Sequence, residues 1–170
     1  VLVAGRKPSG SKPAAARIDT AGKVVGLSLD PADGTAAQST LTGVTSDGKS
    51  AYFVGGEPAG ESLIAPWTAW DGEMAGSIHS RPAATTLFDQ THADPVLGVV
   101  MVDESPVIVA SRDESEGPAA AIYTLSDGTW SSGDKTHDKL TSRTASVLHF
   151  SAIASRGSRL LIAGDATGSD

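Results

Sequence analysis

A short apolar run closed by small residues occurs four times in this 170-residue chain, and it constrains the fold more than any other feature. The copies are VLVAG at 1–5, AYFVGG at 51–56, VIVAS at 107–111 and LLIAG at 160–164. Their matched positions, Val3, Val54, Val109 and Ile162, are 51, 55 and 53 residues apart. A β-branched, apolar run that ends in small residues is typical of a buried strand. The near-constant period predicts a repeat protein built from strands.

Other landmarks keep this period. The dipeptides at 43–44, 98–99 and 152–153 are 55 and 54 residues apart, and Trp67 and Tyr123 are 56 apart. No segment shows the i, i+3, i+4, i+7 apolar stripe of a long helix. The sequence therefore predicts an all-β fold.

Turn signals divide the chain into units of antiparallel strands. The second unit is predicted to contain, in order, strand 41–45, turn 46–49, strand 51–56, loop 57–61, strand 62–70, a turn at Asp71-Gly72 and an outer strand 73–79. The third is predicted to contain strands 96–102, 106–111, 118–125 and 129–132, with a polar loop at 112–117 and a turn at 127–128. The predicted boundaries are 1–40 for a partial unit, 41–95 and 96–149 for complete units, and 150–170 for the start of another.

The segment SDGKSAYFVGG at 46–56, followed by Trp67 and Trp70, resembles a kelch-type β-propeller blade. The resemblance implies four-stranded antiparallel blades, of which about three are present here. Closed propellers hold about four to eight blades. The chain is therefore expected to be part of a longer polypeptide and of a larger closed propeller, with the remaining blades supplied by the same or another chain.

Composition narrows the possible partners. With 20 acidic and 13 basic residues, the formal net charge of -7 argues against binding nucleic acid, which requires a basic surface. The absence of cysteine excludes disulfides, thiolate catalysis and cysteine-bound metals. No apolar run approaches the roughly 20 residues that span a bilayer, so the protein is not expected to be membrane-embedded. The Ala, Gly, Ser, Thr and Asp bias suggests a secreted or cell-envelope bacterial protein.

Recognised catalytic motifs are missing from the sequence. The four histidines, His79, His92, His137 and His149, have no metal-ligand spacing, and the chain contains no nucleophile elbow or P-loop. We therefore predict no catalytic residue, no cofactor and no metal. The acidic run at 113–116 is interpreted as a solvated loop rather than a calcium loop, which needs oxygen ligands at alternating positions.

The resemblance implies that ligands bind over one face, formed by loops that enter the first strand of each blade and loops that join its second and third strands. Long loops on a repeat scaffold often carry function. The candidate ligand-binding residues in these loops are Arg81, His92, Asp94, Arg112, Asp113 and His137.

Each candidate has a second, structural interpretation. His92 and Asp94 are either a general acid and base or turn-capping groups. Arg112 and Asp113 either hold a carboxylate or sugar or form an exposed ion pair. The three tryptophans stack on sugar rings or pack the blades.

Three classes of function remain open. The favoured prediction is a non-catalytic, extracellular recognition or scaffold propeller that binds a protein or a glycan through its loop face. The alternative is an extracytoplasmic propeller enzyme, a glycan hydrolase or lyase or a kelch-type oxidase, with its site partly outside this segment. A structural spacer is the third, because fold alone does not choose among functions.

Overall fold

The computed structural model of the chain describes residues 1–6, 13–29, 40–56, 67–76, 78–81, 96–114, 117–132 and 147–167. These residues contain strands and turns and no helix. The thirteen strands are β1 (Leu2–Arg6), β2 (Pro13–Ile18), β3 (Val24–Leu27), β4 (Thr40–Ser46), β5 (Ser50–Gly56), β6 (Trp67–Glu73), β7 (Ile78–Arg81), β8 (Val96–Val102), β9 (Ser105–Glu114), β10 (Gly117–Ser126), β11 (Thr129–Ser132), β12 (Val147–Arg156) and β13 (Arg159–Thr167).

The strands form four separate antiparallel sheets, each a meander in chain order. The first sheet is β1-β2-β3, the second β4-β5-β6-β7, the third β8-β9-β10-β11 and the fourth β12-β13. The expected all-β class and the four-stranded antiparallel units are therefore confirmed, and they are compatible with propeller blades. No sheet among the described residues closes on itself.

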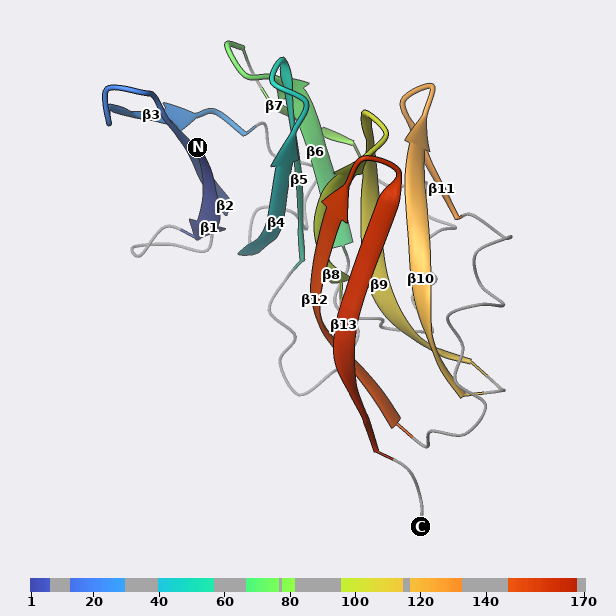
Figure 1. The fold of residues 1–170 in the computed structure, drawn as a ribbon. Helices are drawn as coiled ribbons and strands as arrows, with labels where there is room; N and C mark the ends of the chain where they lie inside the picture. The colour runs from blue at the N-terminus through green and yellow to red at the C-terminus, as the bar shows by residue number, and fades with distance from the viewer. Residues whose placement is uncertain are drawn as a thin grey trace.

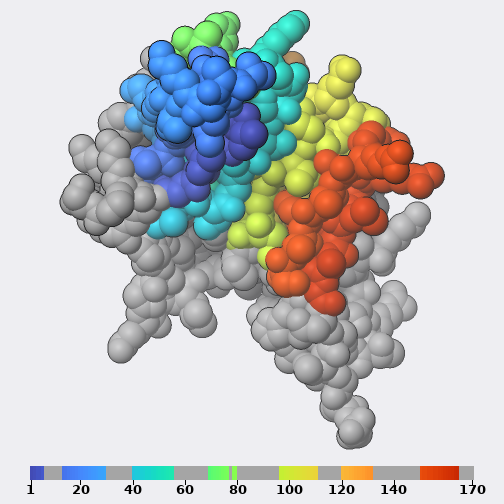
Figure 2. Space-filling view, turned by 60° about the vertical axis from the view of Figure 1, so that its left-hand side comes forward, coloured from blue at the N-terminus to red at the C-terminus, as the bar shows by residue number. Residues whose placement is uncertain are grey.

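The sheets follow one another across the molecule (Figures 1 and 2). An apolar layer lies between each neighbouring pair. Between the first and second sheets, Ala15 packs with Phe53 and Trp70. Between the second and third, Val54 packs with Tyr123. The third and fourth are joined by a layer that contains Val107, Val109, Ala120, Phe150, Ile153 and Ile162. The second and third sheets are therefore apolar on both faces.

Strict alternation along each inner strand produces the two apolar faces, because successive side chains of a strand point to opposite sides. On β5, Phe53 faces the first sheet and Val54 faces the third. On β9, Ile108 faces the second sheet and Val109 faces the fourth. All four are at most 1% exposed. Strands buried on both faces read as continuous apolar runs, which explains the recurring run in the sequence.

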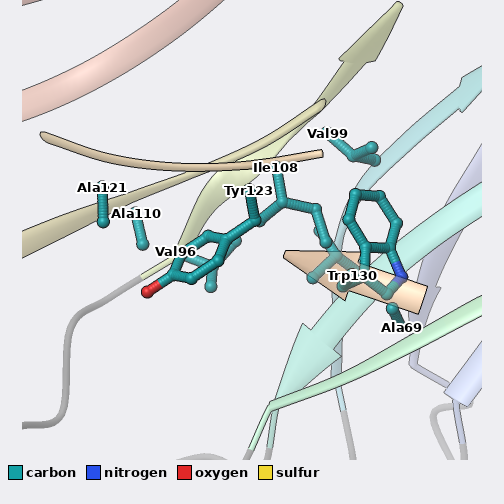
Figure 3. Packing of buried hydrophobic residues seen from close by; sticks show 9 residues of the cluster. Ala69, Val96, Val99, Ile108, Ala110, Ala121, Tyr123 and Trp130 are labelled. Carbon is teal, nitrogen blue, oxygen red and sulfur yellow. The ribbon is translucent and has the colours of Figure 1, made fainter. Parts of the chain in front are cut away.

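Aromatic residues fill the layer between the second and third sheets (Figure 3). Tyr123 lies beside Ile108, and Trp130 lies next to Ala69 of the second sheet. Tyr123 and Trp130 are 2% and 4% exposed, and Trp70 in the neighbouring layer is 1% exposed. These three aromatic side chains therefore pack the sheets and offer no ring face to a sugar. The side chain of Trp67 lies outside the described residues.

A β-bulge recurs at the same place in three sheets and fixes the true repeat register. The pairing shifts between Leu41 and Gly43, between Val96 and Gly98, and between Phe150 and Ala152. Beyond the bulge, Ile153 pairs with Ile162 as Val44 pairs with Phe53. Ala163, not Ile162, is therefore the equivalent of Val54 and Val109, and the sequence alignment of the last copy was wrong by one residue.

Glycines sit where the first strands of neighbouring sheets come closest. A Cβ atom on Gly43 of β4 would lie 2.8 Å from Cα of Gly98 on β8. A Cβ atom on Gly98 would lie 3.2 Å from Cδ1 of Ile153 on β12. The 43–44, 98–99 and 152–153 landmarks of the sequence are thus neighbours in space, with the small residue forming the contact.

The turn predicted at Asp71-Gly72 was wrong. Both residues lie inside β6, where they pair with Tyr52 and Ala51 of β5. The chain reverses after Glu73, whose carbonyl accepts a hydrogen bond from the Gly76 N–H at 2.9 Å. Strand β5 begins at Ser50, which pairs with Glu73 of β6. The hydrogen-bonded ladder between β5 and β6 therefore extends past Asp71-Gly72 and holds both residues in an extended conformation.

The polar loop predicted at 112–117 was also wrong for most of its length. Strand β9 continues to Glu114 and β10 begins at Gly117, and these two residues pair. Backbone pairing does not require apolar side chains, so a charged sequence extends the hairpin there. The turn at Asp127-Gly128 is confirmed: both residues have positive φ, 51° and 74°, as a type I′ hairpin requires.

Candidate functional site

The two ends of the sheets differ in how their strands are joined (Figure 1). At one end, which we call the turn end, short reversals join β2 to β3, β4 to β5, β6 to β7, β8 to β9, β10 to β11 and β12 to β13. At the other, which we call the loop end, strands are joined by the segments 7–12, 57–66, 82–95, 115–116 and 133–146. The segment 30–39 differs, because Leu29 forms an isolated bridge with Ile78 at the start of β7, close to the β6–β7 reversal. The pairs Arg6↔Pro13, Gly56↔Trp67 and Glu114↔Gly117 mark the loop end.

At the turn end, Asp47 organises the β4–β5 reversal. Its Oδ1 accepts hydrogen bonds from the N–H groups of Lys49 and Ser50 at 2.8 and 2.7 Å. These bonds, Ser50 first, lower the pKa of Asp47 because they favour the ionised carboxylate. The side-chain oxygen of Ser46 accepts from Gly48 N–H at 2.9 Å and completes the turn. A locally satisfied turn of this kind is a structural feature.

A polar row crosses the second sheet next to this turn. Thr45, Tyr52, Asp71 and His79 are directly paired neighbours on four successive strands. Directly opposite residues project from the same face of a sheet. The row therefore brings a hydroxyl, a phenol, a carboxylate and an imidazole together on the face toward the third sheet.

This row departs from the repeat. The equivalent positions of the third sheet are Val100, Val107, Thr124 and Ser131, so its first two strands carry valine there. In the fourth sheet the position of Tyr52 is held by Leu161. Positions where a chain breaks its own pattern are candidates for function.

Tyr52 couples the row to the turn. Its hydroxyl lies 3.4 Å from Oδ2 of Asp47. Partial burial is the main reason that its pKa is raised, and the negative charges of Asp47 and Asp71 act in the same direction. Tyr52 is therefore a neutral hydrogen-bond donor at physiological pH, held beside two carboxylates.

The chemistry available to this row is hydrogen bonding and proton exchange. Asp71 and His79 each already have an interaction with another group. Within the part of the chain that the structure describes, no three His, Cys, Asp or Glu side chains gather in a way that holds a metal ion. The row offers polar contacts to a ligand.

The residues predicted from the sequence lie toward the loop end or outside the described ranges. Arg81 ends β7, where its backbone pairs with Ala69. Arg112 and Asp113 lie on β9 and pair with Ala119 and Pro118. The other three candidates, His92, Asp94 and His137, fall outside the described residues, as does the proposed acid–base pairing of His92 with Asp94.

The polar row was missed by sequence reasoning, although a signal for it exists. Placing a turn at Asp71-Gly72 moved Asp71 off the sheet and left His79 as an isolated histidine. Counting forward from the Asp47 turn puts Tyr52 on a strand, and a longer β6 then puts Asp71 beside it. The missing information was the length of the β5–β6 ladder.

Comparisons with protein-family models, with curated proteins and with solved structures return no match for this chain. Functional inference therefore rests on its own residues. In the described part of the chain, no helix is long and apolar enough to cross a membrane.

Proposed function

We propose that this chain is a non-catalytic recognition scaffold, a degenerate kelch-like portion of a β-propeller, that binds a protein or a glycan at its loop end. One observation carries the proposal. Four connecting segments of six to fourteen residues and one of two residues join strands at a single end, while short turns close the other. Variable segments on a rigid sheet scaffold are a common way to build a binding surface.

The rigidity of the scaffold supports the same proposal. Val54, Ile108, Val109 and Ala51 are at most 1% exposed, so the strands that carry the segments are packed from both faces. A packed strand holds the ends of a connecting segment at fixed positions and reduces the ordering cost of binding. Arg112 and Asp113 lie among the last residues of β9, before the two-residue segment 115–116.

The proposed location is extracytoplasmic, and the proposed partners are a surface protein or a polysaccharide. The excess of acidic over basic residues in the chain disfavours nucleic acid as an alternative partner.

Affinity electrophoresis through gels that contain a neutral or an acidic polysaccharide tests the proposal. The double variant Arg112→Ala/His92→Ala removes two loop-end candidates, and Lys49→Ala serves as a turn-end control. We expect retardation of the wild type and of Lys49→Ala, and loss of retardation in the double variant with its circular dichroism unchanged.

Two results would contradict the proposal. Retardation lost in Tyr52→Phe or Asp71→Asn, but kept in the loop-end double variant, would move the site to the polar row. Release of reducing sugar, or oxygen consumption with a polysaccharide substrate, would make the protein an enzyme.

A further inference from the structure

Met74 lies in the reversal between β6 and β7 and is bonded to the neighbouring reversal in two ways. Its backbone N–H donates a hydrogen bond to the carbonyl of Lys49 at 2.8 Å. Its sulfur accepts a hydrogen bond from the Ser46 hydroxyl, with 3.1 Å between Oγ and Sδ. Ser46 ends β4, and Lys49 lies between β4 and β5. Met74 therefore joins the two reversals at the turn end of the second sheet through both its backbone and its side chain.

The side chain of Met74 also packs against the apolar layer between the first and second sheets. This layer includes Ala51 and Ile78, which are both 0% exposed. The N–H of Ile78 donates a hydrogen bond to the carbonyl of Ser28 at 3.0 Å, and Leu29 forms a bridge with Ile78. The chain that follows β3 is thus attached to the second sheet at a residue of the same layer that Met74 packs against.

The thioether of Met74 is open to oxidation. The side chain is half-buried, so solvent reaches part of it. Peroxide converts an accessible methionine to its sulfoxide. The sulfur lone pair forms a bond to one oxygen of hydrogen peroxide, the O–O bond breaks, and the other oxygen leaves as water. Sulfur is oxidised and the peroxide is reduced, so the step needs no further reactant.

Oxidation changes what the sulfur atom can contact. Methionine sulfoxide is polar and disrupts apolar packing, because a polar group in an apolar layer costs free energy unless it is hydrogen-bonded. The 3.1 Å between Sδ of Met74 and Oγ of Ser46 leaves no room for an added oxygen, since an O–H···O hydrogen bond alone takes about 2.7 Å. We expect the oxidised side chain to move away from the Ser46 hydroxyl and from the apolar layer.

We propose that Met74 is a peroxide-sensitive modification site whose oxidation loosens the junction between the first and second sheets. Met101, the other methionine of the chain, provides an internal contrast. It lies on β8 and is also half-buried, but it is not among the described residues that pack the three apolar layers. Both methionines are open to peroxide, and only the oxidation of Met74 is coupled to the packing of the sheets.

Treatment with dilute hydrogen peroxide, followed by peptide mass mapping, tests the proposal. In the wild type we expect one added oxygen on Met74 and a fall of about 3 °C in the midpoint of thermal unfolding. Amide hydrogen exchange of Ile78 is expected to become about tenfold faster, as for the loss of one hydrogen bond. Methionine sulfoxide reductases for both sulfoxide epimers are expected to reverse all three changes.

Two leucine variants separate the effects of the two methionines. Met74→Leu keeps a side chain of similar volume that peroxide does not oxidise. Its thermal midpoint and its Ile78 exchange rate are expected to be the same before and after treatment. Met101→Leu keeps Met74 as its only methionine and is expected to respond like the wild type. Its response tests the proposal even if Met74→Leu fails to fold.

Three results would overturn the proposal. The first is a Met74 that stays reduced under conditions that oxidise Met101. The second is complete oxidation of Met74 with no change in the thermal midpoint and in the exchange of Ile78. The third is a folded Met74→Leu variant that peroxide destabilises as much as it destabilises the wild type, because that result places the sensitive group elsewhere.

Discussion

A Cβ atom on Gly43 would lie 2.8 Å from Cα of Gly98, a separation that real Cβ atoms essentially never show. The same atom would lie 2.8 Å from the backbone nitrogen of Val99. Backbone cannot move aside as the end of a flexible side chain can, so Gly43→Ala must push β4 away from β8. We expect a loss of about 3 kcal/mol in the free energy of unfolding, measured by urea denaturation.

Gly26→Ala is the matched control for that substitution. Gly26 lies on β3, and an added Cβ meets no atom within 4 Å. Alanine reduces the freedom of the unfolded chain, so we expect a change between zero and a gain of about 1 kcal/mol. Equal losses in the two variants would show that the close approach of β4 and β8 does not exist.

Trp70 provides a second test, because its indole N–H is buried without a hydrogen-bond partner among the described residues. Trp70→Ala is expected to cost about 3–5 kcal/mol through the cavity that it leaves. Trp70→Phe loses less apolar area and removes an unpaired donor that itself costs about 1–3 kcal/mol. We therefore expect Trp70→Phe to cost about 1 kcal/mol in the same urea experiment. Equal costs for both variants would indicate that the N–H has a partner.

The β8–β9 turn is strained by its side chains. Asp103 and Glu104 both have positive φ, 45° and 64°, a conformation that disfavours L-residues by about 1–2 kcal/mol. Glu104→Gly relieves this strain and is expected to raise the free energy of unfolding by about 1 kcal/mol. The midpoint of thermal unfolding is expected to rise with it.

The converse substitution is Gly128→Glu in the β10–β11 turn, where Gly128 has a φ of 74°. We expect it to lower stability by about the same amount. Shifts of the thermal midpoint in opposite directions for Glu104→Gly and Gly128→Glu would support positive φ angles in both turns. Shifts in the same direction for the two variants would contradict this geometry.

The carboxylate of Asp47 makes one part of the stability depend on pH. Hydrogen bonds from Ser50 and Lys49 lower its folded-state pKa below the ordinary value of 3.8. A depressed carboxyl pKa contributes stability that is complete above the unfolded-state value and is lost as pH falls toward the folded-state value. Asp47→Ala is therefore expected to cost about 1 kcal/mol at pH 7.

Below pH 3.8, the difference between wild type and Asp47→Ala is expected to shrink as the wild-type carboxylate becomes protonated. Urea denaturation at pH 7 and pH 3 measures both differences. A difference that grows on acidification would contradict the hydrogen-bonded turn.

Much of the fold could be predicted from the sequence because the same physical constraint recurs in each unit. Strands such as β5 and β9 are buried on both faces, and continuous apolar runs report this directly. Asp127-Gly128 carries its own turn signal. The spacing of Gly43 and Gly98 also matched the repeat, and both lie on the first strand of a unit.

The features that were missed depend on pairing between strands, which local patterns do not encode. Asp71-Gly72 has turn chemistry, but the β5–β6 ladder overrides it. The bulges at Leu41, Val96 and Phe150 recur at equivalent places, and the pairing beyond them shows that Ala163, not Ile162, matches Val54 and Val109. The polar row of Tyr52, Asp71 and His79 depends on the length of the β5–β6 ladder and on its pairing register, and sequence reasoning therefore missed it.

A nuclear Overhauser experiment on the first strands of the sheets tests the central claim of the fold most directly. If β4, β8 and β12 stack through the glycine positions, the Hα protons of Gly98 show strong cross-peaks to those of Gly43 and to the δ-methyl group of Ile153. Both cross-peaks are expected in the folded chain. Assigned resonances without either cross-peak would show that the sheets do not pack in this order.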